Sequence, residues 1–165
     1  MRKQENNKKD ILTALNTLRS LFSKTKQDLQ ISSKELYNLI QEEYTIPISI
    51  FESNLAPLET LVKYLKENLN LTYSEIAKLL NRNERTVWTS YKFSIKKEKE
   101  RLIVKPGFFV PISIFSDRKF SILESLVQYL KEKFMLSYHE IAVLLNRDDR
   151  TIWTVYRRAK EKYVK

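Results

Sequence analysis

Two groups of side chains in this chain place hydrogen-bond donors and positive charge at helical spacing. The groups carry similar residue types in the same order, and their members are Arg85, Thr89 and Lys92, and then Arg150, Thr154 and Arg157. Spacings of three and four residues put each group on one face of a helix. Arg and Lys can donate to guanine O6 and N7, and the Thr methyl group can contact a thymine methyl group. This chemistry is suited to reading base edges in a major groove.

Each group follows a short helix whose start is marked in the sequence. Thr72 and Glu75 form a capping box, in which each side chain pairs with a backbone N–H at the helix start. Ser137 and Glu140 repeat the same pair. Apolar residues at helical spacing follow in both copies, so we expect a helix with one buried face.

A tight turn is expected between each short helix and the helix that carries the donors. Asn81 and Asn146 can adopt the left-handed conformation that commonly ends a helix. Asn83 and Asp148 then suit the N-cap of the following helix. The chain therefore predicts two helix-turn-helix units.

Both copies contain Glu-Ile-Ala, two further leucines, and then Asn/Asp-Glu/Asp-Arg-Thr-Val/Ile. This run resembles the helix-turn-helix of sigma-factor region 4 and of LuxR-type regulators. The resemblance implies double-stranded DNA as a partner and, for a sigma-like factor, RNA polymerase or another transcription protein. The sequence departs from the family pattern at two positions, because the turn Gly is replaced by Asn81 or Asn146 and the commonly apolar turn residue by Arg82 or Arg147. These arginines add charge where the chain would approach a phosphate.

The resemblance also places Trp88 and Trp153 at a groove-facing position. On a helical wheel, however, each indole lies near the direction of Tyr91 or Tyr156, which favours packing on the flank of the core. We favour core packing. The two interpretations are compatible, since a ring at the groove edge can also contact sugar and thymine methyl groups.

The remaining cations of these segments are better suited to phosphates than to bases. They are Arg82, Lys96, Lys97, Arg147, Arg158 and Lys162. The complete set of candidate DNA-binding residues is Arg82, Asn83, Arg85, Trp88, Thr89, Lys92, Arg147, Asp148, Arg150, Trp153, Thr154, Arg157 and Arg158.

The two units belong to a longer internal repeat. Residues 44–51 correspond to 108–115, and their prolines and alternating isoleucines favour extended segments, either as two arms or as a short ribbon. A supporting helix then starts at Pro57 in one copy and at Ser121 in the other.

The expected fold class is all-α, with two tandem helix-turn-helix units, supporting helices and an N-terminal helical segment. We place the N-terminal segment at 1–43, the first repeat at 44–105 and the second at 106–165. In the N-terminal segment, Asp10 can cap a helix with a strong apolar stripe, and a second helix starts at Ser32 or Ser33. Its apolar face can dock on the rest of the chain, bind a partner or form a homodimer.

Composition narrows the class of protein further. The 165 residues include a single Gly and four Pro, which favours helices over folds that need many tight turns. A net charge of +10 indicates a polyanionic partner, nucleic acid before membrane. No Cys is present to bind metal or form disulfides, and no apolar run approaches the roughly 18 residues of a membrane span. We therefore expect a cytoplasmic, nucleoid-associated protein with no metal site and no membrane partner.

An enzyme is not expected, because the chain has one His, no Gly-rich loop and no carboxylate pair set apart from helix caps and helix-surface charge partners. We expect no cofactor. The sequence favours a sequence-specific DNA-binding protein, either a transcription regulator or a sigma-like factor. The alternatives are an architectural or nucleoid DNA-binding protein and a protein-interaction module derived from helix-turn-helix repeats.

The connector between the repeats suggests a geometry for the DNA site. Glu98 to Gly107 can span about 35 Å at roughly 3.3–3.6 Å per residue, with a hinge around Lys105. This length is close to one turn of B-DNA, about 34–36 Å. We therefore expect half-sites about one turn apart. A direct repeat is preferred, because a short connector more readily relates the copies by translation.

Overall fold

Helices dominate the described part of the chain, which comprises residues 13, 16–17, 20–21, 23–24 and 44–163 of the computed structural model. The all-α prediction is confirmed, and the described residues add one two-stranded sheet. Residues 1–43 and residues 44–165 form separate compact units. The described residues of the first unit are helical, whereas the predicted helix starts at Asp10 and at Ser32 or Ser33 lie outside the described residues.

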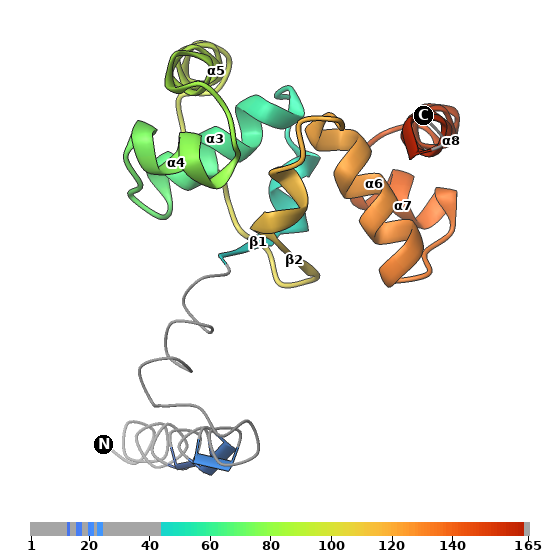
Figure 1. Cartoon of the computed structure of the whole chain (residues 1–165), viewed down its shortest axis with the longest axis horizontal. Helices are drawn as coiled ribbons and strands as arrows, with labels where there is room; N and C mark the ends of the chain where they lie inside the picture. The colour runs from blue at the N-terminus through green and yellow to red at the C-terminus, as the bar shows by residue number, and fades with distance from the viewer. Residues whose placement is uncertain (1–12, 14–15, 18–19, 22, 25–43, 164–165) are drawn as a thin grey trace. The chain divides into compact units, whose positions relative to one another are not determined.

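The second unit contains the internal repeat, and its two copies have the same order of elements (Figure 1). The first copy comprises β1 (Thr45–Pro47), the 3-10 helix η1 (Ile48–Glu52), α3 (Pro57–Glu67), α4 (Tyr73–Leu79) and α5 (Glu84–Lys97). The second comprises β2 (Phe109–Pro111), η2 (Ile112–Phe115), α6 (Ile122–Lys133), α7 (Tyr138–Leu144) and α8 (Asp149–Tyr163). In each copy the first long helix packs against the two that follow it.

The predicted capping boxes form at the starts of α4 and α7. The Thr72 backbone N–H donates to the Glu75 carboxylate at 2.7 Å, and Ser137 donates to Glu140 at the same distance. In return, each hydroxyl accepts from the backbone N–H three residues later. These pairs satisfy backbone donors that would otherwise be unpaired, so both short helices start where the sequence predicts.

The predicted turns are also confirmed. Asn81 and Asn146 have φ of 49° and 50°, in the left-handed region. The N–H of the following residue then donates back to the last turn of the short helix, from Arg82 to Ala77 at 2.8 Å in the first copy. This bond closes a Schellman motif, which ends the helix and redirects the chain within a few residues.

The extended segments are shorter than the sequence indicates, and this prediction needs correction. Strand β1 ends at Pro47, and η1 follows with Ile48, Ile50 and Phe51 all at least 98% buried. A strand would turn alternate residues outward, so it could not bury Ile50 and Phe51 together. The 3-10 helix buries all three on one side, and η2 does the same with the corresponding apolar residues Ile112 and Phe115.

The extended parts form the predicted ribbon, and its register relates the two copies. Strands β1 and β2 are antiparallel, and Ile46 is opposite its own counterpart Val110. The counterpart rings of Phe51 and Phe115 also meet, with centroids 6.0 Å apart. Contacts between equivalent residues are the mark of a two-fold axis. The copies are therefore related by a local two-fold rotation, and the expected translation is wrong.

The connector is also different from the expected hinge. Leu102 is buried, and its carbonyl accepts a hydrogen bond from Asn68 at 3.3 Å. The backbone N–H of Lys105 donates to Ser49 at 3.1 Å, and its ammonium pairs with Glu52. The connector thus lies against the first copy and does not span freely between the two.

Within the described residues, no helix has both the length and the apolar character needed to cross a bilayer.

Candidate nucleic-acid interface

Helices α5 and α8 lie on the side of the unit that is away from the β1–β2 ribbon, and both are seen end-on in Figure 1. Val87 of α5 is fully buried against α3 and α4, and Ile152 of α8 takes the same place in the second copy. One bond repeats in both copies: Tyr91 donates to Glu67 at 3.2 Å, and Tyr156 donates to Glu132 at 3.3 Å. Each helix is thus held along one face, and within the described part of the chain its opposite face is exposed.

The free face of each helix carries the predicted base-reading residues. Arg85 and Lys92 are exposed, as are their counterparts Arg150 and Arg157, whereas Thr89 and Thr154 are half-buried. Among the described residues, no acidic side chain forms a salt bridge with Arg85 or Arg150. Both guanidinium groups are therefore available to a partner.

The threonines of this face offer a partner their methyl groups more than their hydroxyl groups. Thr89 donates its hydroxyl to the Arg85 carbonyl at 2.8 Å, and Thr154 donates to the Arg150 carbonyl at 2.7 Å. This bond occupies the hydroxyl proton within the helix itself. A methyl group beside an arginine suits a thymine next to a guanine.

Both tryptophans lie outside the core. Trp88 is 48% exposed and Trp153 is 46% exposed, so the preferred interpretation of core packing is wrong. Direction on a helical wheel did not decide their burial, because none of the described elements covers this flank of either helix. The Lys92 ammonium lies 5.5 Å from the Trp88 ring centroid, and the Arg157 guanidinium lies 5.6 Å from that of Trp153. The Trp88 ring therefore orients a cation on the exposed face, whereas Arg157 is also held by an ion pair with Glu161 at 2.8 Å.

The turn before α5 forms a basic hollow. Arg82 lies here beside Lys78 and Arg118, and the Arg118 guanidinium donates to the Asn81 carbonyl at 3.3 Å. The Arg82 Nε is buried and has no hydrogen-bond partner among the described residues. Burial lowers the pKa of Arg82, and the nearby Arg118 charge lowers it further. An anion in this hollow would relieve both effects, as a phosphate would.

The equivalent turn before α8 is less basic. Arg147 also has a buried Nε without a partner among the described residues, but Asp148 lies beside it. The Asp148 carboxylate accepts from the Thr151 hydroxyl at 2.6 Å and from its backbone N–H at 2.8 Å, and these bonds lower the pKa of Asp148. Asp148 therefore acts as a helix cap, and the predicted direct contact with DNA is not supported by this arrangement. Asn83 caps α5 in the same way by accepting from the Arg85 N–H at 2.8 Å.

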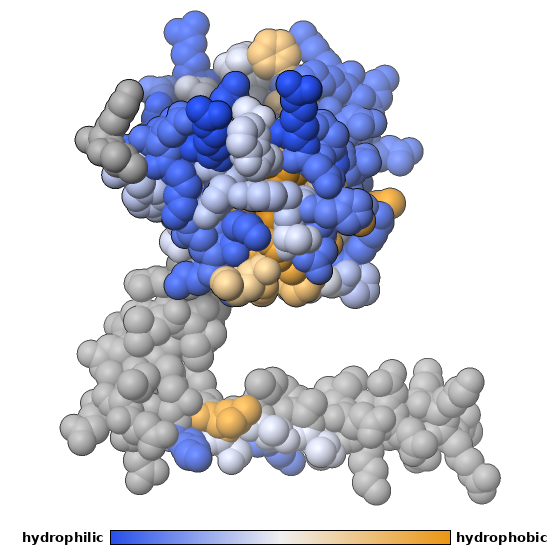
Figure 2. Space-filling view, turned by 90° about the vertical axis from the view of Figure 1, so that its right-hand side faces the viewer, coloured by the Kyte–Doolittle hydropathy of each residue, from blue (hydrophilic) through white to orange (hydrophobic). Residues whose placement is uncertain are grey.

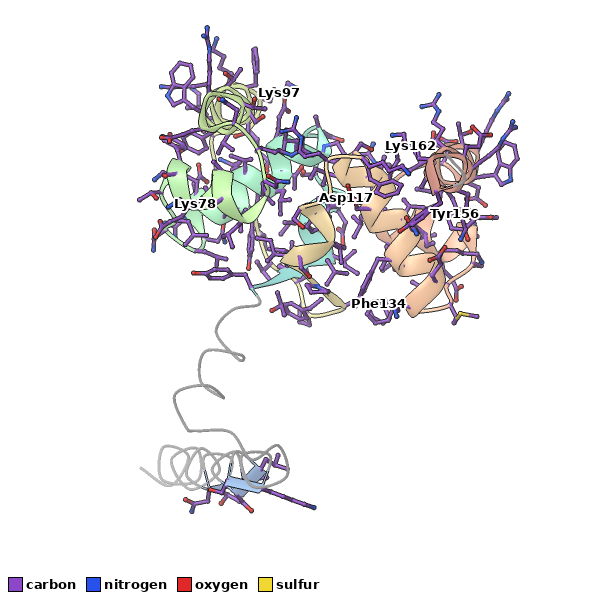
Figure 3. All side chains as sticks on the ribbon, in the orientation of Figure 1. Lys78, Lys97, Asp117, Phe134, Tyr156 and Lys162 are labelled. Carbon is purple, nitrogen blue, oxygen red and sulfur yellow. The ribbon has the colours of Figure 1, made fainter. Side chains whose placement is uncertain are left out.

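Two of the predicted phosphate-binding lysines have structural partners. Lys97 pairs with Glu59 at 2.8 Å, and Lys162 pairs with Glu124 at 2.6 Å. Both lysines lie on the facing sides of α5 and α8 (Figure 3). Each ion pair holds the C-terminal end of a candidate recognition helix, α5 or α8, against the N-terminal end of its supporting helix, α3 or α6. Arg158 keeps an exposed side chain on α8, as expected of a phosphate contact.

Sequence reasoning missed three residues of this surface. Arg118 comes from the second copy and reaches the turn of the first, so only the tertiary fold brings it there. Lys78 lines the same hollow at a position held by Val143 in the second copy. Phe93 is 50% exposed, one turn beyond Thr89, and its helical spacing could have revealed it.

The surface of the second copy is largely hydrophilic where it faces the viewer in Figure 2. Within the described residues, no three His, Cys, Asp or Glu side chains cluster in a way that could hold a metal ion.

Comparison with protein-family models, with curated proteins and with solved structures finds no match to this chain.

Proposed function

We propose that this protein binds double-stranded DNA sequence-specifically, as a transcription regulator or sigma-like factor, through α5 and α8 in the major groove. The observation that carries the proposal is the repetition of one constellation on both helices, with its Arg and Trp side chains exposed and its Thr half-buried. Arg85, Trp88 and Thr89 recur as Arg150, Trp153 and Thr154 at identical spacing. Arg and Thr side chains on one exposed face can distinguish bases in the major groove.

The chemistry of the two turns supports the same proposal. Arg82 and Arg147 flank the starts of α5 and α8 and have unpartnered donors among the described residues. Contacts to phosphates from such positions fix the register of a helix on the duplex without reading sequence. The exposed face of each helix would thus read bases, and the turn before it would position the helix on the phosphates.

A binding titration tests the proposal. The full chain is titrated against a duplex selected from a random DNA pool and against an unselected duplex, at several salt concentrations. We expect a preference of at least about a thousandfold for the selected duplex. Two units that neutralise roughly six to ten phosphates also give a log–log salt slope near −0.9 per contact.

Two other results would contradict the proposal. A salt-dependent affinity without sequence preference would indicate an architectural role, in which the same helices contact phosphates and shape. An affinity that scarcely changes between low and moderate salt would count against nucleic acid as the partner.

A further inference from the structure

The two-fold relation of the copies extends beyond the ribbon. The Ile48 N–H donates to the Phe108 carbonyl at 2.9 Å, and the Ile112 N–H donates to the Tyr44 carbonyl at 2.8 Å. Because Ile48 corresponds to Ile112 and Tyr44 to Phe108, these two bonds exchange under the rotation. The ribbon therefore has the isologous pairing of a symmetric dimer, although a single chain supplies both sides.

Each turn also contacts the other copy, although the two bonds are not equivalents under the rotation. Arg118 of the second copy donates to the Asn81 carbonyl at 3.3 Å, and Asn146 donates to the Glu52 carbonyl at 3.4 Å. The turn of the first copy thus touches the loop after η2, and the turn of the second copy touches the last residue of η1. The two turns are thereby fixed relative to each other.

This symmetry determines how α5 and α8 face a duplex. Both helices lie on one side of the unit, away from the ribbon through which the local axis passes (Figure 1). A two-fold rotation reverses the direction of a helix that lies across its axis. Consequently α5 and α8 present the same constellation in opposite directions.

A DNA duplex has two-fold axes of its own, perpendicular to the helix axis, and an inverted repeat extends that symmetry to the bases. We propose that a single chain occupies an inverted repeat, with its local two-fold axis on the dyad between the half-sites. This inference rests on the proposed function. It replaces the direct repeat expected from the length of the connector, because the ribbon, rather than the connector, sets the orientation of the copies.

We expect the two half-sites to share some bases and to differ at others. Arg85 and Arg150 lie in the first turn of their helices, so the bases they read are the same in both halves. Further along, an exposed Phe93 on α5 corresponds to an exposed Arg158 on α8. Phenylalanine can contact a thymine methyl group, whereas arginine can donate to guanine or phosphate. The two half-sites of the inverted repeat are therefore expected to differ at the base pairs that Phe93 and Arg158 contact.

Four duplexes built from the selected half-sites test the arrangement. They carry an inverted repeat, a direct repeat, an inverted repeat with about half a turn of DNA inserted at its centre, and a single half-site. Affinity is measured with the full chain, and sedimentation gives the number of chains per duplex. We expect one chain on the inverted repeat and an affinity at least about 100-fold weaker on the other three, because only the first engages both helices.

Equal affinity for the direct repeat, or two chains on one inverted repeat, would overturn the inference while sequence-specific binding stands. No preference for any of the four over random DNA would overturn the proposed function as well. The variant Phe93→Arg gives a second readout that does not depend on disrupting the fold. Selection from random DNA with this variant should yield two half-sites that are more alike than those of the wild type. Half-sites that differ as much as before would contradict the assigned asymmetry.

Discussion

Under the proposed function, Arg85 and Arg150 are the residues on which the reading of a DNA sequence depends most. Both are exposed, and within the described chain neither forms a salt bridge. We expect Arg85→Ala and Arg150→Ala each to weaken binding to the selected duplex by about 1–3 kcal/mol, with little effect on random DNA. Titration of each variant on both duplexes measures the difference, with Lys99→Ala at an exposed position of the connector as the control. Equal losses on the two duplexes would reassign the arginines to phosphates.

The ion pair between Glu124 and Lys162 makes the stability of the packing of α8 depend on pH. Burial alone would raise the pKa of Glu124, but hydrogen bonds from Lys162 and from the Ser121 backbone outweigh it and lower the pKa below its ordinary value. A carboxyl group with a lowered folded pKa stabilises the fold fully above its unfolded pKa, about 4.3. That stability is lost as the pH falls through the folded pKa.

Thermal unfolding measured between neutral pH and pH 3 tests this linkage. The wild-type midpoint should fall on acidification, and Glu124→Gln should lower the neutral midpoint and flatten the fall. The control is Glu161→Gln, which removes an exposed carboxylate paired with Arg157 on the surface of α8. If Glu124→Gln left the acid-induced fall unchanged, the Lys162 pair would have no part in holding α8.

At the scale of elements, the turn between α4 and α5 depends on a left-handed residue. Asn81 has φ of 49°, a conformation that costs alanine about 1–2 kcal/mol but costs glycine no steric strain. Asn81→Ala should therefore lower the free energy of unfolding by about that amount, and Asn81→Gly much less. Urea unfolding of the two variants compares them directly. Equal stability of the alanine and glycine variants would show that the turn does not need this conformation.

The elements also show what sequence can predict. Capping boxes such as Thr72 with Glu75, and turn residues such as Asn81, act over a few positions, so their signals stand in the sequence itself. The ribbon register that pairs Ile46 with Val110, and the approach of Arg118 to Asn81, join residues far apart in the chain. No local pattern encodes such contacts, which is why the orientation of the copies had to come from the fold.

The environment of Trp88 was only partly predictable from the sequence. The helix and the direction of the side chain were predictable from helical spacing, but its exposure depends on whether another element covers that flank. The same limit applies to the hollow around Arg82, whose third cation comes from the other copy.

At the scale of the whole molecule, the unit formed by residues 44–165 has the symmetry of a dimer, although both halves belong to one chain. Its copies share a ribbon and the Phe51–Phe115 contact, so the positions of α5 and α8 are set by a common core. Because the two copies have separate sequences, the proposed function allows each to adapt to a different half-site without changing the other. A homodimer has no such freedom.

Hydroxyl-radical footprinting of the full chain on its selected duplex tests most directly whether both copies bind DNA. We expect two protected patches about one turn of DNA apart on one face of the duplex. Arg85→Ala should weaken protection in one patch and Arg150→Ala in the other. Protection of a single half-site of about five or six base pairs, unchanged by Arg150→Ala, would contradict the account.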